Sequence, residues 1–188
     1  MNVIKCLQSA LVRLRRMPRT RGFGVQSPSA YRFLRDVVST RGRYAITEVQ
    51  RSNEPSVKKD RLKLLKFYAR IANFTQAKHW FISERLASAD METYVCAGCQ
   101  EAQVSSEFSE NEVYVIDADD VQLVDDILNK ASSTSLLIIE GINRSRNTFD
   151  RWRQVMTDSR TGVCFDMYKI GVVFFDLKKF KTSYQVNL

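Results

Sequence analysis

Six short apolar runs from residue 79 onward constrain the fold of this chain more than any other feature. They are HWFIS (79–83), TYVCAG (93–98), EVYVID (112–117), SLLIIEGI (135–142), GVCFD (162–166) and GVVFFDL (171–177). Several are apolar throughout, which is typical of strands that are buried on both faces of a sheet. Helical stretches at 120–131 and 147–157 separate the later runs, so the pattern predicts an α/β sheet.

The connection between the last two runs predicts how the sheet ends. Only the stretch DMYKIG, 166–171, joins them. A parallel crossover requires a dozen or more residues, so we expect these two strands to be antiparallel in a mostly parallel sheet.

Helices are expected ahead of the sheet. An apolar stripe along residues 2–17 should end at Pro18, and Ser27 with Pro28 suits the start of a second helix. The clearest helical period covers residues 56–74. We expect the first stripe to dock on the sheet or on a second copy in a homodimer, and an anionic membrane surface is the alternative.

The positive charge of the chain is concentrated in its first quarter. Residues 1–50 hold ten Lys or Arg and two acids, and the resulting excess equals the net charge of +8 for all 188 residues. We therefore divide the chain into a basic helical arm with a lid loop, 1–57, and a reduced α/β domain, 58–188. The arm suits an anionic partner, whether nucleic acid, lipid or protein, and a solvated basic face is the simpler interpretation.

The cysteines and the hydropathy pattern indicate a soluble, cytoplasmic protein. Four cysteines are too few for a disulfide framework in a chain of this length, and no apolar run approaches the ~18 residues of a membrane span. Cys96 and Cys99 form a CxxC pair, which could be redox-active or half of a zinc site. Two small buried hydrophobes is the favoured interpretation, and we expect no metal site.

Motifs near the two ends of the chain point to a known family. The first is RGFGVQSP at 21–28, and the second combines IEGIN at 139–143, Trp152 and the stretch from Asp166 to Phe175. Together they resemble a bacterial family of class I S-adenosylmethionine-dependent methyltransferase-like proteins. The resemblance implies a Rossmann-like, methyltransferase-type sheet, mostly parallel with a C-terminal antiparallel strand pair and preceded by N-terminal helices.

The resemblance also implies a site at the carboxyl ends of the strands. Contacts to the cofactor S-adenosylmethionine would fall on Ser83, Glu84, Gly98 and Asp117. The candidate catalytic residues near a substrate are Asp117, Glu140 and Tyr31.

The segment RGFGVQSP is expected to form a lid over this edge of the sheet. Its candidate contact residues are Arg21, Gly22, Gly24, Gln26 and Ser27. Gly22 and Gly24 permit backbone angles that other residues resist. Gln26 stands where the family has histidine, and an amide does not exchange protons near neutral pH.

The middle of the chain departs from the family. The stretch ERLASADMET after the first strand has no glycine. It is also too short to hold a crossover helix before a strand at 93–98. The run 93–98 does not end in the acid that would bind the ribose hydroxyls. We therefore expect a binding or scaffolding module with a lost donor site and no cofactor. The alternatives are an active S-adenosylmethionine-dependent methyltransferase of a small molecule, and a nucleic-acid-binding protein that uses the basic arm.

Overall fold

The computed structural model describes residues 3–20, 22, 24–39 and 59–188, with side chains described from residue 11 onward. The predicted lid residue Arg21 and the predicted domain boundary at residue 57 lie outside the described residues. Among the helices that are described, none has the length and apolar content needed to cross a membrane.

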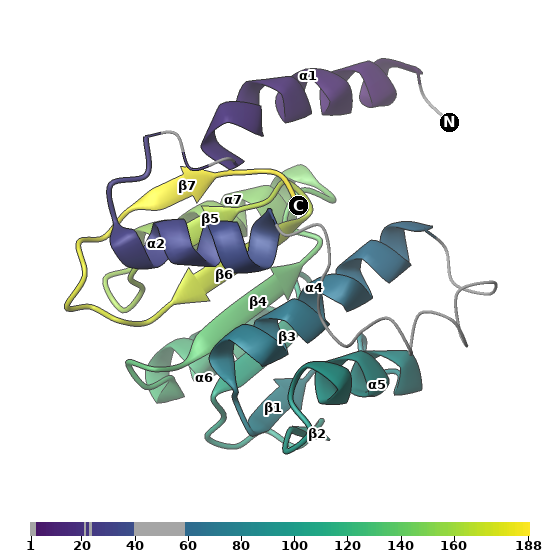
Figure 1. Cartoon of the computed structure of the whole chain (residues 1–188), viewed down its shortest axis with the longest axis vertical. Coiled ribbons are helices and arrows are strands. Elements are labelled where there is room, and N and C mark those ends of the chain that lie inside the picture. The colour runs from purple at the N-terminus through teal and green to yellow at the C-terminus, as the bar shows by residue number, and fades with distance from the viewer. Residues whose placement is uncertain (1–2, 21, 23, 40–58) are drawn as a thin grey trace.

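A seven-stranded sheet with the order β2-β1-β3-β4-β6-β5-β7 forms the centre of the molecule (Figure 1). Its strands are β1 His79–Ile82, β2 Gln103–Ser105, β3 Val113–Asp117, β4 Leu136–Glu140, β5 Cys164–Asp166, β6 Ile170–Phe174 and β7 Ser183–Gln185. Only β6 runs antiparallel to its neighbours, β4 and β5. The predicted mixed α/β sheet with a C-terminal antiparallel pair is therefore confirmed.

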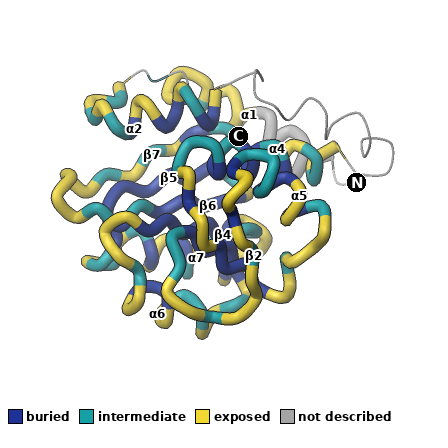
Figure 2. Tube along the Cα trace, turned by 60° about the horizontal axis from the view of Figure 1, so that its bottom comes forward, coloured by how far each residue is buried: buried dark blue, intermediate teal, exposed yellow. Residues whose placement is uncertain are grey.

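Helices cover both faces of this sheet. They are α1 Val3–Thr20, α2 Pro28–Phe33 with the π-helical turn η1 Leu34–Val38, α4 Lys59–Thr75, α5 Ala89–Gly98, α6 Val121–Lys130 and α7 Arg146–Thr157. Figure 1 shows α2, α4 and α5 in front of the sheet, with α6 and α7 behind it. Val113 and Val115 of β3 face the first layer, Tyr114 and Ile116 face the second, and all are buried. The inner strands of the sheet accordingly form the dark blue centre of Figure 2.

The segment TYVCAG is a helix, so the prediction of a strand at 93–98 was wrong. The buried residues of α5, Met91, Tyr94 and Val95, have the i, i+3, i+4 spacing of a helix that packs against α4. Ser88 caps α5 by accepting a hydrogen bond from the Met91 amide. The run was too short for its period to distinguish a buried strand from a buried helix.

The crossover that appeared too short is therefore complete. Helix α5 returns the chain to the starting edge of the sheet, and β2 then runs parallel to β1 with His79 opposite Gln103. The second strand thus lies at 103–105, and an acid, Glu107, follows two residues later. The length of the crossover and the acid expected after the second strand therefore give no argument for a lost donor site.

Helix α1 differs from expectation in two ways. It continues through Pro18 to Thr20, whereas we expected it to end at Pro18. Its apolar stripe does not dock on the sheet, since Leu11 and Leu14 are each 63% exposed. The predicted start of the second helix is correct, because Ser27 caps α2 and Pro28 is its first residue.

Candidate functional site

The turns after β1 and β3 meet where the strand order reverses. The chain passes from β1 to β2 on one side and then returns to place β3 on the other side of β1. In open α/β sheets, ligands bind in the crevice outside the carboxyl ends of the strands at such a switch point. Residues 83–88 and 117–120 form the two turns that border this crevice.

An ion pair joins these two turns. The Arg85 Nε lies 2.8 Å from Oδ1 of Asp120, whose side chain is only 11% exposed. The turn after β1 is also folded on itself, because the Ser83 carbonyl accepts hydrogen bonds from the amides of Leu86 and Ala87. None of residues 83–88 is glycine, so every backbone position of this turn carries a Cβ.

Ser83 is the buried polar residue of the described part of this crevice whose side chain has no hydrogen-bond partner. The residue is buried, and its Oγ has no hydrogen-bond partner within the described part of the chain. A buried hydroxyl that makes no hydrogen bond costs about 1–3 kcal/mol. Ser83 is therefore the feature of this edge that favours a bound ligand.

Asp117, at the end of β3, is held by Arg144. The guanidinium donates to both carboxylate oxygens, at 2.9 Å and 2.6 Å, and also to Asp119 at 2.6 Å. Burial raises the pKa of the Asp117 carboxyl, but the hydrogen bonds from Arg144 and the Asp119 amide outweigh it and lower the pKa below its ordinary value. Asp117 is thus ionised at neutral pH, where a catalytic acid would need a proton.

Glu140, at the end of β4, is held by two residues of α4. Its Oε1 accepts a hydrogen bond from the Tyr68 hydroxyl at 2.6 Å and lies 3.2 Å from Arg61 Nη1. Burial, together with the Glu140 charge, raises the pKa of Tyr68 well above its usual value, so the phenol keeps its proton. Glu140 is therefore fixed between a neutral donor and a cation.

Asp166, at the end of β5, follows the same pattern. Its Oδ1 lies 2.7 Å from Arg16 Nη1 of α1, and both side chains are largely buried. Acids that follow β3, β4 and β5 are thus each paired with an arginine. Throughout the ranges given above, no three His, Cys, Asp or Glu side chains are arranged to hold a metal ion.

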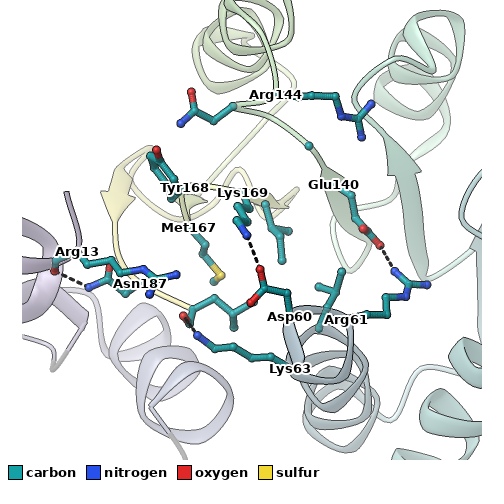
Figure 3. Close-up of a pocket in the computed structure, with 15 residues that line it drawn as sticks. Arg13, Asp60, Arg61, Lys63, Glu140, Arg144, Met167, Tyr168, Lys169 and Asn187 are labelled. Atoms are coloured by element: carbon teal, nitrogen blue, oxygen red, sulfur yellow. Dashed lines mark hydrogen bonds and ion pairs between the residues drawn. The ribbon is translucent and has the colours of Figure 1, made fainter. Parts of the chain in front are cut away.

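A cavity of about 560 Å³ lies one strand beyond the switch point, at the ends of β4 and β6 (Figure 3). Its lining is Arg13, Asp60, Arg61, Lys63, Leu64, Glu140, Gly141, Asn143, Arg144, Met167, Tyr168, Lys169, Ile170, Asn187 and Leu188. Five cationic side chains in this set face two carboxylates, and the remainder of the wall is largely apolar. This size and composition suit a small organic ligand.

Arg13 and Lys63 are the cations of the cavity that make no ion pair with an acidic side chain of the described residues. Lys169 pairs with Asp60 at 2.8 Å, whereas Lys63 donates to the Leu188 carbonyl oxygen. Burial, followed by repulsion from Arg13, lowers the pKa of Lys63. The cavity therefore carries an excess of positive charge, which an anion would neutralise.

The predicted site residues are distributed over several places. Ser83 and Asp117 border the switch point, Glu84 follows Ser83 in the exposed turn, and Glu140 lines the cavity. Gly98 lies at the opposite edge of the sheet, at the end of α5, where a Cβ would stand 2.1 Å from the Ala69 carbonyl oxygen. Gly98 and Ser83 are therefore not brought together.

The predicted lid residues do not line the cavity. Gly22 and Gly24 have φ angles of +88° and +77°, as the loop requires. A Cβ on Gly22 would lie 2.5 Å from the ring of Tyr31, so Tyr31 packs against this loop, and neither it, Gln26 nor Ser27 borders the cavity. The arm reaches the cavity through Arg13 instead.

The cavity cations were missed because they come from four separate segments. Arg13 lies on α1, Arg61 and Lys63 on α4, Arg144 after β4, and Lys169 between β5 and β6. The only sequence signal was the basic side of the 56–74 helix.

Cys96 and Cys99 are free thiols, and burial raises the pKa of Cys96, which disfavours the reactive thiolate.

Comparison with known proteins gives structural matches only. No family model and no curated protein matches the chain. A putative caffeoyl-CoA O-methyltransferase from Staphylococcus aureus has a TM-score of 0.48 and 11% identity, over 77% of this chain and 98% of that one. A putative O-methyltransferase from Klebsiella pneumoniae has a TM-score of 0.44 and 12% identity, over 74% and 93%. The fold itself is a Rossmann-like mixed α/β sheet.

Proposed function

We propose that this chain is a binding module on a methyltransferase-type fold, with a donor crevice closed by its own side chains. The observation that carries the proposal is the Arg85–Asp120 ion pair, which spans the two turns of the switch point. The pairing of Asp117 with Arg144 supports it, because that carboxylate is already fully hydrogen-bonded on one side. In this proposal a donor would compete with Arg85 and Arg144, whose side chains are 63% and 50% exposed, for these two carboxylates.

The residues of the crevice do not fit S-adenosylmethionine. An adenosyl ligand at a switch point lies against a glycine-rich turn and helix amides, and here the turn is Ser83–Ser88 without glycine. The Ser83 hydroxyl alone favours a ligand, and it belongs to the turn that Arg85 ties to the turn after β3. We therefore derive no methyl transfer for this chain.

The ligand of the module, in this proposal, is a small organic anion with an apolar part, bound in the cation-lined cavity. Arg13 and Lys63 would hold the anionic group, and the apolar wall with Leu64, Met167 and Ile170 would hold the rest. Charge-assisted hydrogen bonds in a partly enclosed site are stronger than on an open surface.

This ligand class can be tested by thermal denaturation with octanoate, and with octanol as the uncharged comparison. Octanoate at about ten times its Kd should stabilise the fold by ~1.4 kcal/mol, a rise in Tm of a few degrees, and octanol should not. The variants Arg13→Gln and Lys63→Gln should remove most of the rise, whereas Arg153→Gln, an exposed cation on α7, should retain it. An equal response of all three variants would contradict the proposal.

The second candidate function is an active S-adenosylmethionine-dependent methyltransferase. Two observations favour it, namely the complete β1-α5-β2 crossover and the buried Ser83 hydroxyl without a partner. Glu107, in the turn after β2, would be its candidate ribose-binding acid. Micromolar binding of the donor or its demethylated product would decide in favour of this candidate.

A nucleic-acid-binding role for the basic arm has weaker support. Arg16 is paired with Asp166, and Arg32 and Arg35 both lie beside Asp36, so these cations are partly neutralised within the chain. Phosphate contacts release counterions, so a salt-independent response to a random duplex would exclude this role.

A further inference from the structure

Helix α1 turns its polar side toward the protein and its apolar side outward. Arg16 points inward, where its Nη1 donates to a carboxylate oxygen and to the backbone carbonyl of Asp166. Leu11 and Leu14 are each 63% exposed, and Met17 is 44% exposed. In a surface helix that packs on the core of its own protein, the apolar side faces inward and the polar side faces solvent, which is the opposite orientation.

The orientation of α1 is fixed by specific contacts. The Asn187 side chain donates to the Arg13 carbonyl, and the Asn187 amide donates to the Thr20 hydroxyl. Together with the Arg16–Asp166 pair, these bonds hold α1 beside β7, beyond the edge of the sheet (Figure 1). Rotation of the helix to bury its leucines would break all of them.

The outward side of α1 carries three of the large exposed apolar residues in the described part of the chain. Tyr31, Val121, Leu177 and Phe180 are the other large exposed apolar residues, and none lies on this helix. In the sequence, the same three- and four-residue spacing continues from Leu11 toward the N-terminus with Leu7, Ile4 and Val3. Exposed apolar side chains that gather on one helix face, as Leu11, Leu14 and Met17 do, mark a binding face.

Charge selects the partner. Helix α1 contains Lys5, Arg13, Arg15, Arg16 and Arg19 and no acid. Arg16 is already paired with Asp166, but a second copy docked on the same face would bring the other cations of both helices together with no acid on either helix, whereas anionic lipid headgroups would neutralise them. Arg15 and Arg19 are exposed beside the apolar stripe, where they can reach headgroups while Leu11 and Leu14 enter the acyl boundary.

We propose that α1 attaches this protein peripherally to an anionic membrane surface, with the stripe of Leu11, Leu14 and Met17 inserted. This inference is independent of the cavity and of the donor crevice. It assigns a ligand to an apolar helix face that the described part of the chain leaves uncovered.

The test is cosedimentation of the full chain with vesicles of phosphatidylcholine alone and with phosphatidylglycerol added. Binding should require phosphatidylglycerol and decrease with added salt. The double variant Leu11→Glu/Leu14→Glu should weaken binding at least tenfold. Val121→Glu makes the same kind of change at an exposed apolar residue of α6 and should bind like the unaltered chain. Equal melting temperatures will show that both variants fold.

Three results would overturn the proposal. The first is equal binding to neutral and anionic vesicles, and the second is binding that survives the Leu11→Glu/Leu14→Glu change. The third is absence of vesicle binding at low salt. If light scattering then shows a lipid-free dimer that the double variant abolishes, a second copy covers the face instead.

Discussion

At the scale of single residues, arginines determine what the carboxyl edge of the sheet can do. Asp117, Asp120, Glu140 and Asp166 are all available in principle as acids or ligands, and each is paired with an arginine. Because each of these carboxyl groups already has a guanidinium beside it, we propose that they stabilise the edge through charge-assisted hydrogen bonds.

The pair of Asp117 and Arg144 makes a specific contribution to stability as a function of pH. The pKa of Asp117 is lower in the folded protein than in the unfolded chain, so its stabilising effect is present above the ordinary carboxyl pKa and is lost as the pH falls through the folded value. Asp117→Asn should lower the free energy of unfolding by about 1 kcal/mol at neutral pH, since Arg144 is half exposed.

Urea denaturation at neutral pH and in acid would measure this effect. The difference between the unaltered chain and Asp117→Asn should shrink in acid. Asp150→Asn removes a solvent-exposed pair with Arg146 and should change little at either pH. If the loss of unfolding free energy in Asp117→Asn were as large in acid as at neutral pH, the lowered pKa of Asp117 would be contradicted.

At the scale of helices and strands, the sequence predicted the buried apolar strands, including the three-residue β5, and missed the two short strands that are partly exposed. The runs that became β3, β4 and β6 are buried along most of their length, so composition alone identified them. Strands β2 and β7 have three residues each and expose their first and last, which leaves no apolar run to detect. The arginine partners were unpredictable because Arg61 and Glu140 are 79 residues apart in sequence.

Gly98 gives a direct test of the packing of α5 on α4. Alanine is favoured over glycine in a helix by ~1 kcal/mol, but here its Cβ would stand 2.1 Å from the Ala69 carbonyl oxygen. Since a backbone atom of a neighbouring helix cannot rotate away, we expect the clash to dominate. Gly98→Ala should destabilise the fold by ~1–3 kcal/mol in chemical denaturation.

Glu92→Ala, at an exposed position of the same helix, serves as the comparison and should be close to neutral. If Gly98→Ala were more stable than the unaltered chain, helix propensity would outweigh packing, and the close contact between α4 and α5 would be wrong.

At the scale of the whole molecule, the basic arm has three separate uses within its described part. Arg16 ties α1 to the sheet, Arg13 contributes to the cavity, and the outward side of α1 presents Leu11 and Leu14 between exposed arginines. The excess charge of the first quarter was evident from the sequence. The direction of each side chain decides which arginine joins an ion pair, which lines the cavity and which lies on the surface, and composition does not encode these directions.

The central claim is that the side chains of the chain itself occupy the crevice at the switch point. Calorimetric titration of the unaltered full chain with S-adenosylhomocysteine tests it most directly. We predict no binding heat up to about 1 mM ligand, corresponding to less than ~4 kcal/mol of binding free energy. A saturable isotherm with a low-micromolar Kd would contradict the claim, because such affinity requires an open crevice beside Ser83 and Asp117.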